Sequence, residues 1–154
     1  MPFELDEIDL AILRTLQKEG RIQNVDLAER VGLSPSPCLR RVRLLEEAGV
    51  IERYVALVDA AKVGMGLTLF ARVWLTGQDE DTVTRFVEAV KNLPQIVDCY
   101  LMAGDCDFLL RVVAADLNAY RQFQIEHLGR IPGVRNIKTD IPMQTIKHSW
   151  EVPV

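Results

Sequence analysis

The chain has 154 residues, of which 49% are hydrophobic and 26% are charged, and its formal net charge is −4. This length fits one or two small domains with compact cores, and the composition is that of a globular chain rather than a disordered or collagen-like one. The acidic balance argues against a nucleic-acid partner for the chain taken as a whole, so any DNA-binding surface has to be local.

Membrane insertion, secretion and cysteine-based sites are not expected. No apolar run approaches the ~18 residues of a membrane span, and the first residues lack a basic segment followed by an apolar one. Cys38, Cys99 and Cys106 are scattered and show no C-x-x-C spacing, so neither a zinc site nor a disulfide framework is encoded. We therefore expect a cytoplasmic protein with no metal and no cofactor.

The first part of the chain predicts two helices. Between Leu5 and Leu16 apolar residues recur at intervals of three and four, and Asp6 supplies a capping side chain. Asn24 is a good N-cap for a second, short helix. Gly32 can adopt the left-handed conformation that ends this second helix.

A third helix is predicted to begin within Ser34–Pro37 and to end at Gly49. Either serine of this segment can cap the helix, and Pro37 disfavours helical dihedrals at Ser36, which favours the later start. The tight turn between the second and third helices is typical of a helix-turn-helix unit, although the end of a generic helical bundle has the same spacing.

The third helix separates its apolar and cationic side chains. Cys38 lies on the side that would pack on the first two helices, Arg40 and Arg43 lie opposite, and Arg41 lies on the flank. Four arginines and no acid occur in residues 30–45, whereas a solvated helix normally mixes both signs. Hydroxyls and backbone N–H groups at the helix start can bind phosphate, and arginine can pair with guanine. The predicted DNA-contacting residues are Ser34, Ser36, Pro37, Arg40, Arg41 and Arg43.

The second part of the chain predicts the order strand, helix, strand, strand, helix, strand. From Leu67 to Leu75 the side chains alternate between two faces, and Phe70 and Trp74 share the outer one. We predict that a second subunit covers these two aromatic residues as a dimer interface, rather than that they form an unremarkable exposed pair. The expected elements are strands at 67–75, 96–103 and 108–113, helices that follow Asp79 and run from Leu117 to Leu128, and a last extended stretch to about Lys147.

These elements predict an α+β protein with two domains. Residues 1–50 form a helix-turn-helix domain of winged-helix-like type, and residues 66–154 form a ferredoxin-like βαββαβ domain with helices on one face of an antiparallel sheet. Residues 51–65 are expected to form a hinge, with a short strand near Tyr54–Leu57.

Several ordered motifs link both domains to one family. The first domain contains D-E-I-D at 6–9, G-R-I with Asn24 at 20–24, and V-G-L-S-P-S-P-C-L-R-R-V-R at 31–43. The second contains Y-L-M-A-G-D-C-D-F at 100–108, A-Y-R at 119–121 and P-G-V at 132–134. Across nearly its whole length the chain resembles the leucine-responsive regulatory protein and asparagine regulator (Lrp/AsnC, feast/famine) transcription factors, and the leucine-responsive branch in particular.

The resemblance implies a sequence-specific DNA-binding regulator, not an enzyme, that responds to a free amino acid. Homodimers, often assembled further into tetramers or octamers, would bind pseudo-palindromic promoter sites on double-stranded DNA in the bacterial cytoplasm, at the nucleoid. The effector, which we expect to be leucine, methionine or another apolar amino acid, would bind at contacts between dimers. Arg40 stands where that branch commonly has an acid, and Asp140 and Pro142 replace apolar or aromatic residues beside the pocket.

The chemistry of an amino-acid site points to the turn between the second and third strands of this domain. Backbone N–H groups of Gly104 and Asp105 can bind a carboxylate, and the side chain of Asp105 or Asp107 can accept from an ammonium group. An ordinary hairpin turn would have the same residues. With the positions that the resemblance associates with effector response, the candidate effector-binding residues are Leu101, Gly104, Asp105, Asp107, Leu117, Ile141 and Pro142.

Two other classes of function are compatible with parts of the sequence. The chain could be an amino-acid-binding assembly module without a DNA role, but its first 60 residues retain the turn and the arginine face. It could be a small ferredoxin-like enzyme that uses Cys106 or His127. The carboxylates that flank Cys106 oppose thiolate formation, and the sequence shows no phosphate-binding glycine loop or nucleophile elbow.

Overall fold

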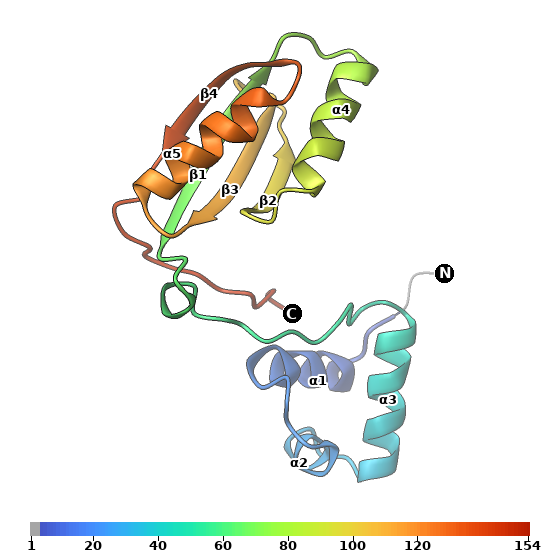
Figure 1. The fold of residues 1–154 in the computed structure, drawn as a ribbon. Helices are drawn as coiled ribbons and strands as arrows, with labels where there is room; N and C mark the ends of the chain where they lie inside the picture. Colours follow the sequence, from blue (N-terminus) through green and yellow to red (C-terminus); the bar gives the residue numbers. More distant parts are fainter. Residues whose placement is uncertain (1–3) are drawn as a thin grey trace. The chain divides into compact units, whose positions relative to one another are not determined.

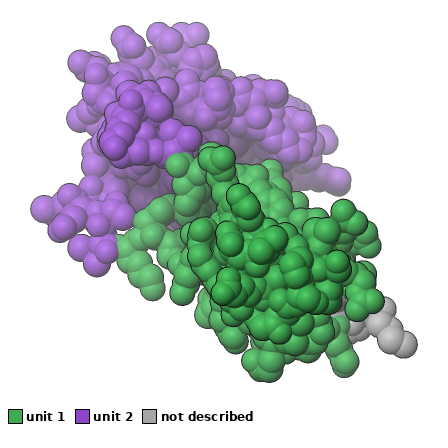
Figure 2. Space-filling model, turned by 90° about the horizontal axis from the view of Figure 1, so that it is seen from below, with its two compact units in different colours: residues 1–57, 147–154 green, residues 58–146 purple. Residues whose placement is uncertain are grey.

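The structure, a computed structural model, describes residues 4–154. The chain forms two compact units (Figure 2): one comprises the described residues up to Leu57 together with Lys147–Val154, and the other comprises Val58–Ile146. The last eight residues therefore group with the N-terminal unit and not with the C-terminal domain to which the sequence boundaries assign them. None of the helices in residues 4–154 combines the length and apolar composition of a membrane-spanning helix.

The N-terminal unit contains three helices, α1 (Glu7–Lys18), α2 (Asn24–Arg30) and α3 (Pro35–Glu47) (Figure 1). The Asp6 side chain caps α1 by accepting from the backbone N–H of Ile8 and Asp9, at 3.0 and 2.9 Å. The backbone N–H of Asp6 donates in return to the Asp9 carboxylate, which completes a capping box. The buried core between the helices is small and consists of Ile12, Leu13, Leu27, Ala28, Cys38 and Leu45.

The junction between α2 and α3 has the tight turn that the sequence predicts, but two details differ. Gly32 adopts a φ of 72°, which ends α2 as expected. The N-cap of α2 is Gln23 rather than Asn24, whose side-chain amide instead donates to the carbonyl of Pro35 at 2.8 Å. The third helix takes the earlier of the two starts, with Ser34 as N-cap. Asn24 therefore joins the starts of α2 and α3.

The hinge strand expected in residues 51–65 is not formed. In this part of the described chain the only regular element is a short 3₁₀ helix, η1 (Ala61–Val63), which ends at Gly64 with a φ of 80°. Tyr54, Val55 and Leu57 remain exposed. A strand needs a neighbour that accepts and donates backbone hydrogen bonds, and nothing within residues 4–154 supplies one to this segment.

The C-terminal unit confirms the predicted βαββαβ order. The elements are β1 (Leu67–Leu75), α4 (Glu80–Lys91), β2 (Ile96–Leu101), β3 (Phe108–Ala114), α5 (Leu117–Glu126), η2 (Leu128–Arg130) and β4 (Val134–Asp140). The sheet has the strand order β2-β3-β1-β4, with each neighbouring pair antiparallel, and α4 and α5 cover one face (Figure 1). Phe86 of α4 and Phe108 of β3 lie in the buried core with ring centroids 4.6 Å apart.

The bounds of β1 are those expected from its alternation, and Leu69, Ala71, Val73 and Leu75 are buried. Other elements are shorter than expected: β2 stops at Leu101, and the last extended stretch is a strand only as far as Asp140. Residues 147–154 pack instead on α1. The Gln17 amide donates to the carbonyl of Val152 at 3.0 Å and accepts from its backbone N–H at 2.6 Å.

Candidate DNA-binding and ligand-binding sites

The outward face of α3 is the candidate DNA-binding surface. Cys38 and Leu45 are fully buried on the opposite side of the helix, so packing fixes which residues face out. Arg40 and Arg43 are exposed, and neither forms an ion pair with any residue in 4–154. A shallow hollow of about 250 Å³ on this face is lined by Ser36, Leu39, Arg40, Arg43, Leu44 and Glu47.

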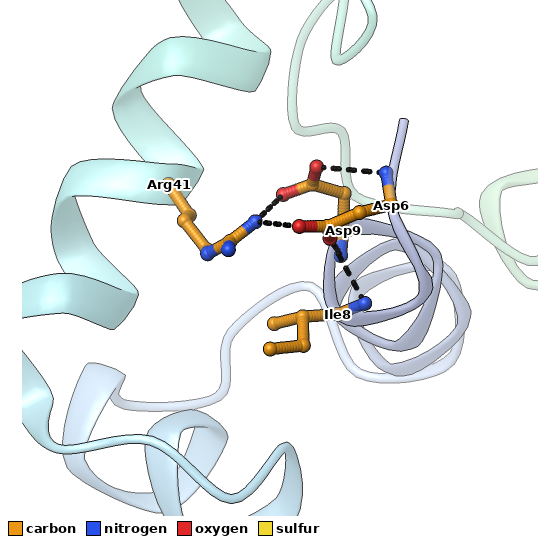
Figure 3. Close-up of polar contacts among 4 residues, drawn as sticks. All are labelled: Asp6, Ile8, Asp9 and Arg41. Atoms are coloured by element: carbon orange, nitrogen blue, oxygen red, sulfur yellow. Dashed lines mark hydrogen bonds and ion pairs between the residues drawn. The ribbon is translucent and has the colours of Figure 1, made fainter. Parts of the chain in front are cut away.

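Arg41 differs from Arg40 and Arg43 because it forms ion pairs with two carboxylates. Its Nη1 lies 2.8 Å from Asp6 Oδ2 and 2.8 Å from Asp9 Oδ1, across the interface between α3 and α1 (Figure 3). These hydrogen bonds raise the pKa of Arg41. The pKa of Asp6 is lowered by the backbone N–H of Asp9 and by Arg41. The side chain of Arg41 therefore joins the capping box of α1 to the middle of α3 (Figure 3).

The other predicted DNA-contacting residues lie at the start of α3. Ser34 and Ser36 are exposed, and the Ser34 side chain makes no capping hydrogen bond. Pro37 is half-buried. Arg30, the other arginine of the acid-free stretch, lies 2.7 Å from Glu19. Of the four arginines in 30–45, Arg40 and Arg43 thus remain unpaired among the described residues.

The hairpin formed by β2 and β3 holds four of the candidate effector residues: Leu101 at the end of β2, and Gly104, Asp105 and Asp107 in the loop. Asp107 is anchored to the end of β1: its carboxylate accepts from the backbone N–H of Leu75 at 2.7 Å and from the Gln78 amide at 2.9 Å. Asp105 is exposed, and its backbone carbonyl accepts from the indole N–H of Trp74 at 2.7 Å. Asp107 thus has a structural role, and the carboxylate of Asp105 is the more available of the two. Leu101 and Gly104 are also exposed in this hairpin.

The other candidate effector residues lie at the opposite end of the sheet. In the register of β1 with β3, Val73 is opposite Phe108, next to the hairpin, and Leu67 is opposite Ala114. Six residues of strand separate these ends, which corresponds to roughly 20 Å at the usual rise per residue. Leu117, Ile141 and Pro142 follow β3 and β4 at the Leu67 end (Figure 1). One copy of the chain does not bring the predicted effector residues together.

The outer face of the sheet carries both predicted dimer residues. Phe70 and Trp74 are half-buried on this face, and the Lys138 ammonium lies 5.3 Å from the centroid of the Trp74 ring. The same face carries an ion pair that the sequence does not predict: Arg72 Nε lies 2.8 Å from Asp140 Oδ2. Strand alternation placed Arg72 on this face, but the pairing register with β4 was needed to identify its partner.

Two family models match the chain. Residues 5–52 match a model described as winged helix-turn-helix DNA-binding, and residues 68–152 match the Lrp/AsnC ligand binding domain. Transcriptional regulator AzlB of Bacillus subtilis is 39% identical over 154 residues, which cover 100% of this chain and 98% of that protein. The leucine-responsive regulatory protein of Escherichia coli is 44% identical over 146 residues, which cover 95% of this chain and 89% of that protein.

Solved structures agree with this assignment. A transcriptional regulator from Neisseria meningitidis, in a complex with L-Met, superposes with a TM-score of 0.94 at 38% identity, over 97% of each chain. An AsnC family transcriptional regulator from Agrobacterium tumefaciens gives 0.92 at 40% identity, again over 97% of each chain. The resemblance stated from the sequence motifs is therefore confirmed, and the chain belongs to the Lrp/AsnC family of transcriptional regulators, with a helix-turn-helix DNA-binding domain and a ligand-binding domain.

Proposed function

We propose that the protein binds pseudo-palindromic sites on double-stranded promoter DNA as a homodimer, with α3 of each copy in the major groove. The observation that carries this proposal is the exposure of Arg40 and Arg43 on one face of α3, where neither forms an ion pair with another of residues 4–154. Ser34 and Ser36 at the start of the helix are placed to bind phosphate. Two α3 helices contact half-sites about one helical turn apart, as in other dimeric helix-turn-helix proteins.

Gel-shift titrations of single variants test this assignment. Arg40→Ala or Arg43→Ala is expected to weaken binding to the specific site by roughly 1–3 kcal/mol if the residue contacts a base. If it contacts phosphate, binding to all sequences weakens and the slope of log K against log salt falls by about one. Arg130→Ala, an exposed arginine in the C-terminal unit, is the control. Unchanged DNA binding by both α3 variants would show that α3 does not contact DNA.

The ligand of the C-terminal unit is, on this proposal, a free amino acid with an apolar side chain. The L-Met in the complex of the Neisseria meningitidis relative supports this class of ligand. In this chain the exposed hairpin provides backbone N–H groups for a carboxylate at Gly104 and an acceptor for an ammonium group at Asp105. Apolar contacts would come from Leu101 and, in another copy, from Leu117, Ile141 and Pro142, because one copy holds these sets at opposite ends of its sheet.

Thermal-shift measurements against the twenty amino acids test the ligand class. A ligand present at 100 times its Kd stabilises the folded state by about 2.7 kcal/mol, so L-Met or L-Leu at millimolar concentration should raise Tm. The α-amides of the same amino acids are the matched controls, since they lack the carboxylate. Asp105→Asn is expected to remove the shift. No Tm increase with any amino acid would contradict the proposed ligand class.

The homodimer of this proposal uses the outer face of the sheet. Phe70 and Trp74 lie there beside Lys138, on the face that neither α4 nor α5 covers. The exposed apolar residues of the hinge, such as Val55 and Leu57, provide a further segment that a second copy can pair with. Phe70→Glu should convert the protein to monomers in sedimentation velocity, and Val25→Glu, an exposed residue of α2, should not. Such dimers assemble further into tetramers or octamers that act at the nucleoid.

A further inference from the structure

The outward face of α3 carries two leucines that the core of its unit does not use. Leu39 is 39% exposed and Leu44 is 44% exposed. Neither is among the buried residues of the N-terminal core or among the half-buried residues packed against it. Both line the hollow that also contains Arg40 and Arg43. Their side chains are therefore available to a molecule that binds this face.

We propose that Leu39 contacts the 5-methyl group of a thymine and so determines part of the DNA sequence that the protein recognises. This inference rests on the proposed DNA-binding function. In the major groove, the apolar group on the edges of the base pairs is the thymine methyl, whereas arginine pairs with guanine. A face on which Leu39 stands beside Arg40 and Arg43 therefore matches a site that contains both bases.

The position of Leu39 along the helix distinguishes it from Leu44. Residues near the N-terminus of a recognition helix meet base edges, and Leu39 lies in the first half of α3, one turn after Ser36. Leu44 lies in the second half, one turn before Glu47, whose carboxylate is repelled by DNA phosphates. Leu44 is thus a matched control: it is a leucine that lines the same hollow, with similar exposure, and it is not expected to reach a base.

The helix geometry also limits where the thymine lies. Leu39 and Arg43 are four residues apart, so their side chains are neighbours with Cβ atoms about 5–6 Å apart. Successive base pairs are about 3.4 Å apart along the duplex. The thymine is therefore expected one or two base pairs from the base that Arg43 contacts.

The experiment replaces single thymines by deoxyuridine, which differs by the missing methyl group. A duplex is selected from a random pool with the full-length protein, each thymine of one half-site is replaced in turn, and Kd is measured for the wild type, Leu39→Ala and Leu44→Ala. At one position the replacement should weaken wild-type binding about fourfold, the factor equivalent to ~0.8 kcal/mol for one methyl-sized group. Leu39→Ala should bind the original duplex several-fold more weakly and lose nothing further at that position, because the two changes remove the same contact.

Leu44→Ala should retain the fourfold sensitivity of the wild type, and Leu39→Met, which keeps an apolar side chain, should retain most of it. The inference is wrong if the wild type is indifferent to every replacement, or if Leu39→Ala remains as sensitive as the wild type. Normal DNA binding by Leu39→Ala would also overturn it. If the random pool contains no duplex that the protein selects, the proposed DNA-binding function fails, and this inference fails with it.

Discussion

The two units of the chain are stabilised differently. Fourteen residues form the buried core of the C-terminal unit, including four aromatic ones, whereas six form the buried core of the N-terminal unit. In the smaller unit, side-chain hydrogen bonds and ion pairs add to this small core. They link α1 to α3 through Arg41, α2 to α3 through Asn24, and α1 to residues 147–154 through Gln17.

Polar contacts contribute most to stability where little apolar area is buried. The C-terminal unit should be sensitive mainly to loss of side-chain volume in its core, and the N-terminal unit also to loss of single polar groups. The two tryptophans allow each unit to be followed separately, because Trp74 lies in β1 and Trp150 lies in the segment that packs on α1. Trp150→Phe and Trp74→Phe backgrounds therefore report one unit each in urea titrations.

The largest effect is expected for Phe86→Ala. Phe86 is fully buried against Phe108, and its truncation should lower the free energy of unfolding of the C-terminal unit by about 3–5 kcal/mol, through lost burial and a cavity. Trp74 fluorescence in the Trp150→Phe background measures this change. The transition reported by Trp150 should stay in place. An equal shift of both transitions would show that the two units unfold together and are not stabilised separately.

Arg41→Met tests the clamp between α1 and α3. The change leaves the buried Asp9 carboxylate without its cation, which should cost the N-terminal unit about 1–3 kcal/mol of stability. Trp150 fluorescence in the Trp74→Phe background measures it. Asp9→Asn in the same protein should restore part of the loss, because the remaining amide is neutral. Arg40→Ala, which removes no ion pair within residues 4–154, is the control and should leave stability unchanged.

The same Arg41 variant separates positioning from direct DNA contact. If Arg41 acts by holding α3, its replacement should weaken specific binding while the salt dependence of binding stays as in the wild type. A fall of about one in the slope of log K against log salt would show that Arg41 contacts phosphate directly, as the sequence prediction has it.

A smaller effect is expected for Gln17→Ala. The Gln17 amide makes two hydrogen bonds to the Val152 backbone, so its loss should destabilise the docked segment by about 0.5–1.5 kcal/mol per bond. Hydrogen exchange at the Val152 amide, whose N–H donates to Gln17, should become faster. Gln122→Ala on the exposed surface of α5 is the control. Unchanged exchange at Val152 would show that the docking of residues 147–154 does not depend on Gln17.

The smallest effect is expected for the dependence of stability on pH in the acid range. The folded-state pKa of Asp6 is lowered from 3.8 by the N–H of Asp9 and by Arg41, so its contribution to stability is present above pH 3.8 and is lost as pH falls through the lowered value. The Asp79 cap of α4 shows the same direction because of Thr82, so the C-terminal unit has an acid-sensitive cap as well. Added salt should weaken the contribution of Asp6 more, since part of it is an ion pair. Urea titrations between pH 2 and 6 of the wild type and Asp6→Asn measure this, and an unchanged pH dependence in the variant would contradict the assignment to Asp6.

Much of the fold follows from periodicity over short stretches. β1 has the predicted bounds because its two faces alternate without interruption, and α3 presents the predicted face because a period of 3.6 residues separates Cys38 and Leu45 from Arg40 and Arg43. The prediction of a hinge strand is wrong because a strand also depends on a distant pairing partner. Tyr54–Leu57 has strand-forming residues, but no segment among residues 4–154 pairs with it.

Sequence patterns predict the helices, the order of helices and strands along the chain, the family and an arginine-rich surface in an acidic chain. The packing of these elements determines which arginines remain unpaired among the described residues, where residues 147–154 dock, and that the candidate effector residues of one copy lie at two ends of a sheet. Arg41 and Asp6 are 35 residues apart, and Gln17 and Val152 are 135 residues apart. Dihedral preferences and apolar periodicity act over a few residues, so they carry no information about such pairs, which form when the packed elements bring them within hydrogen-bonding distance.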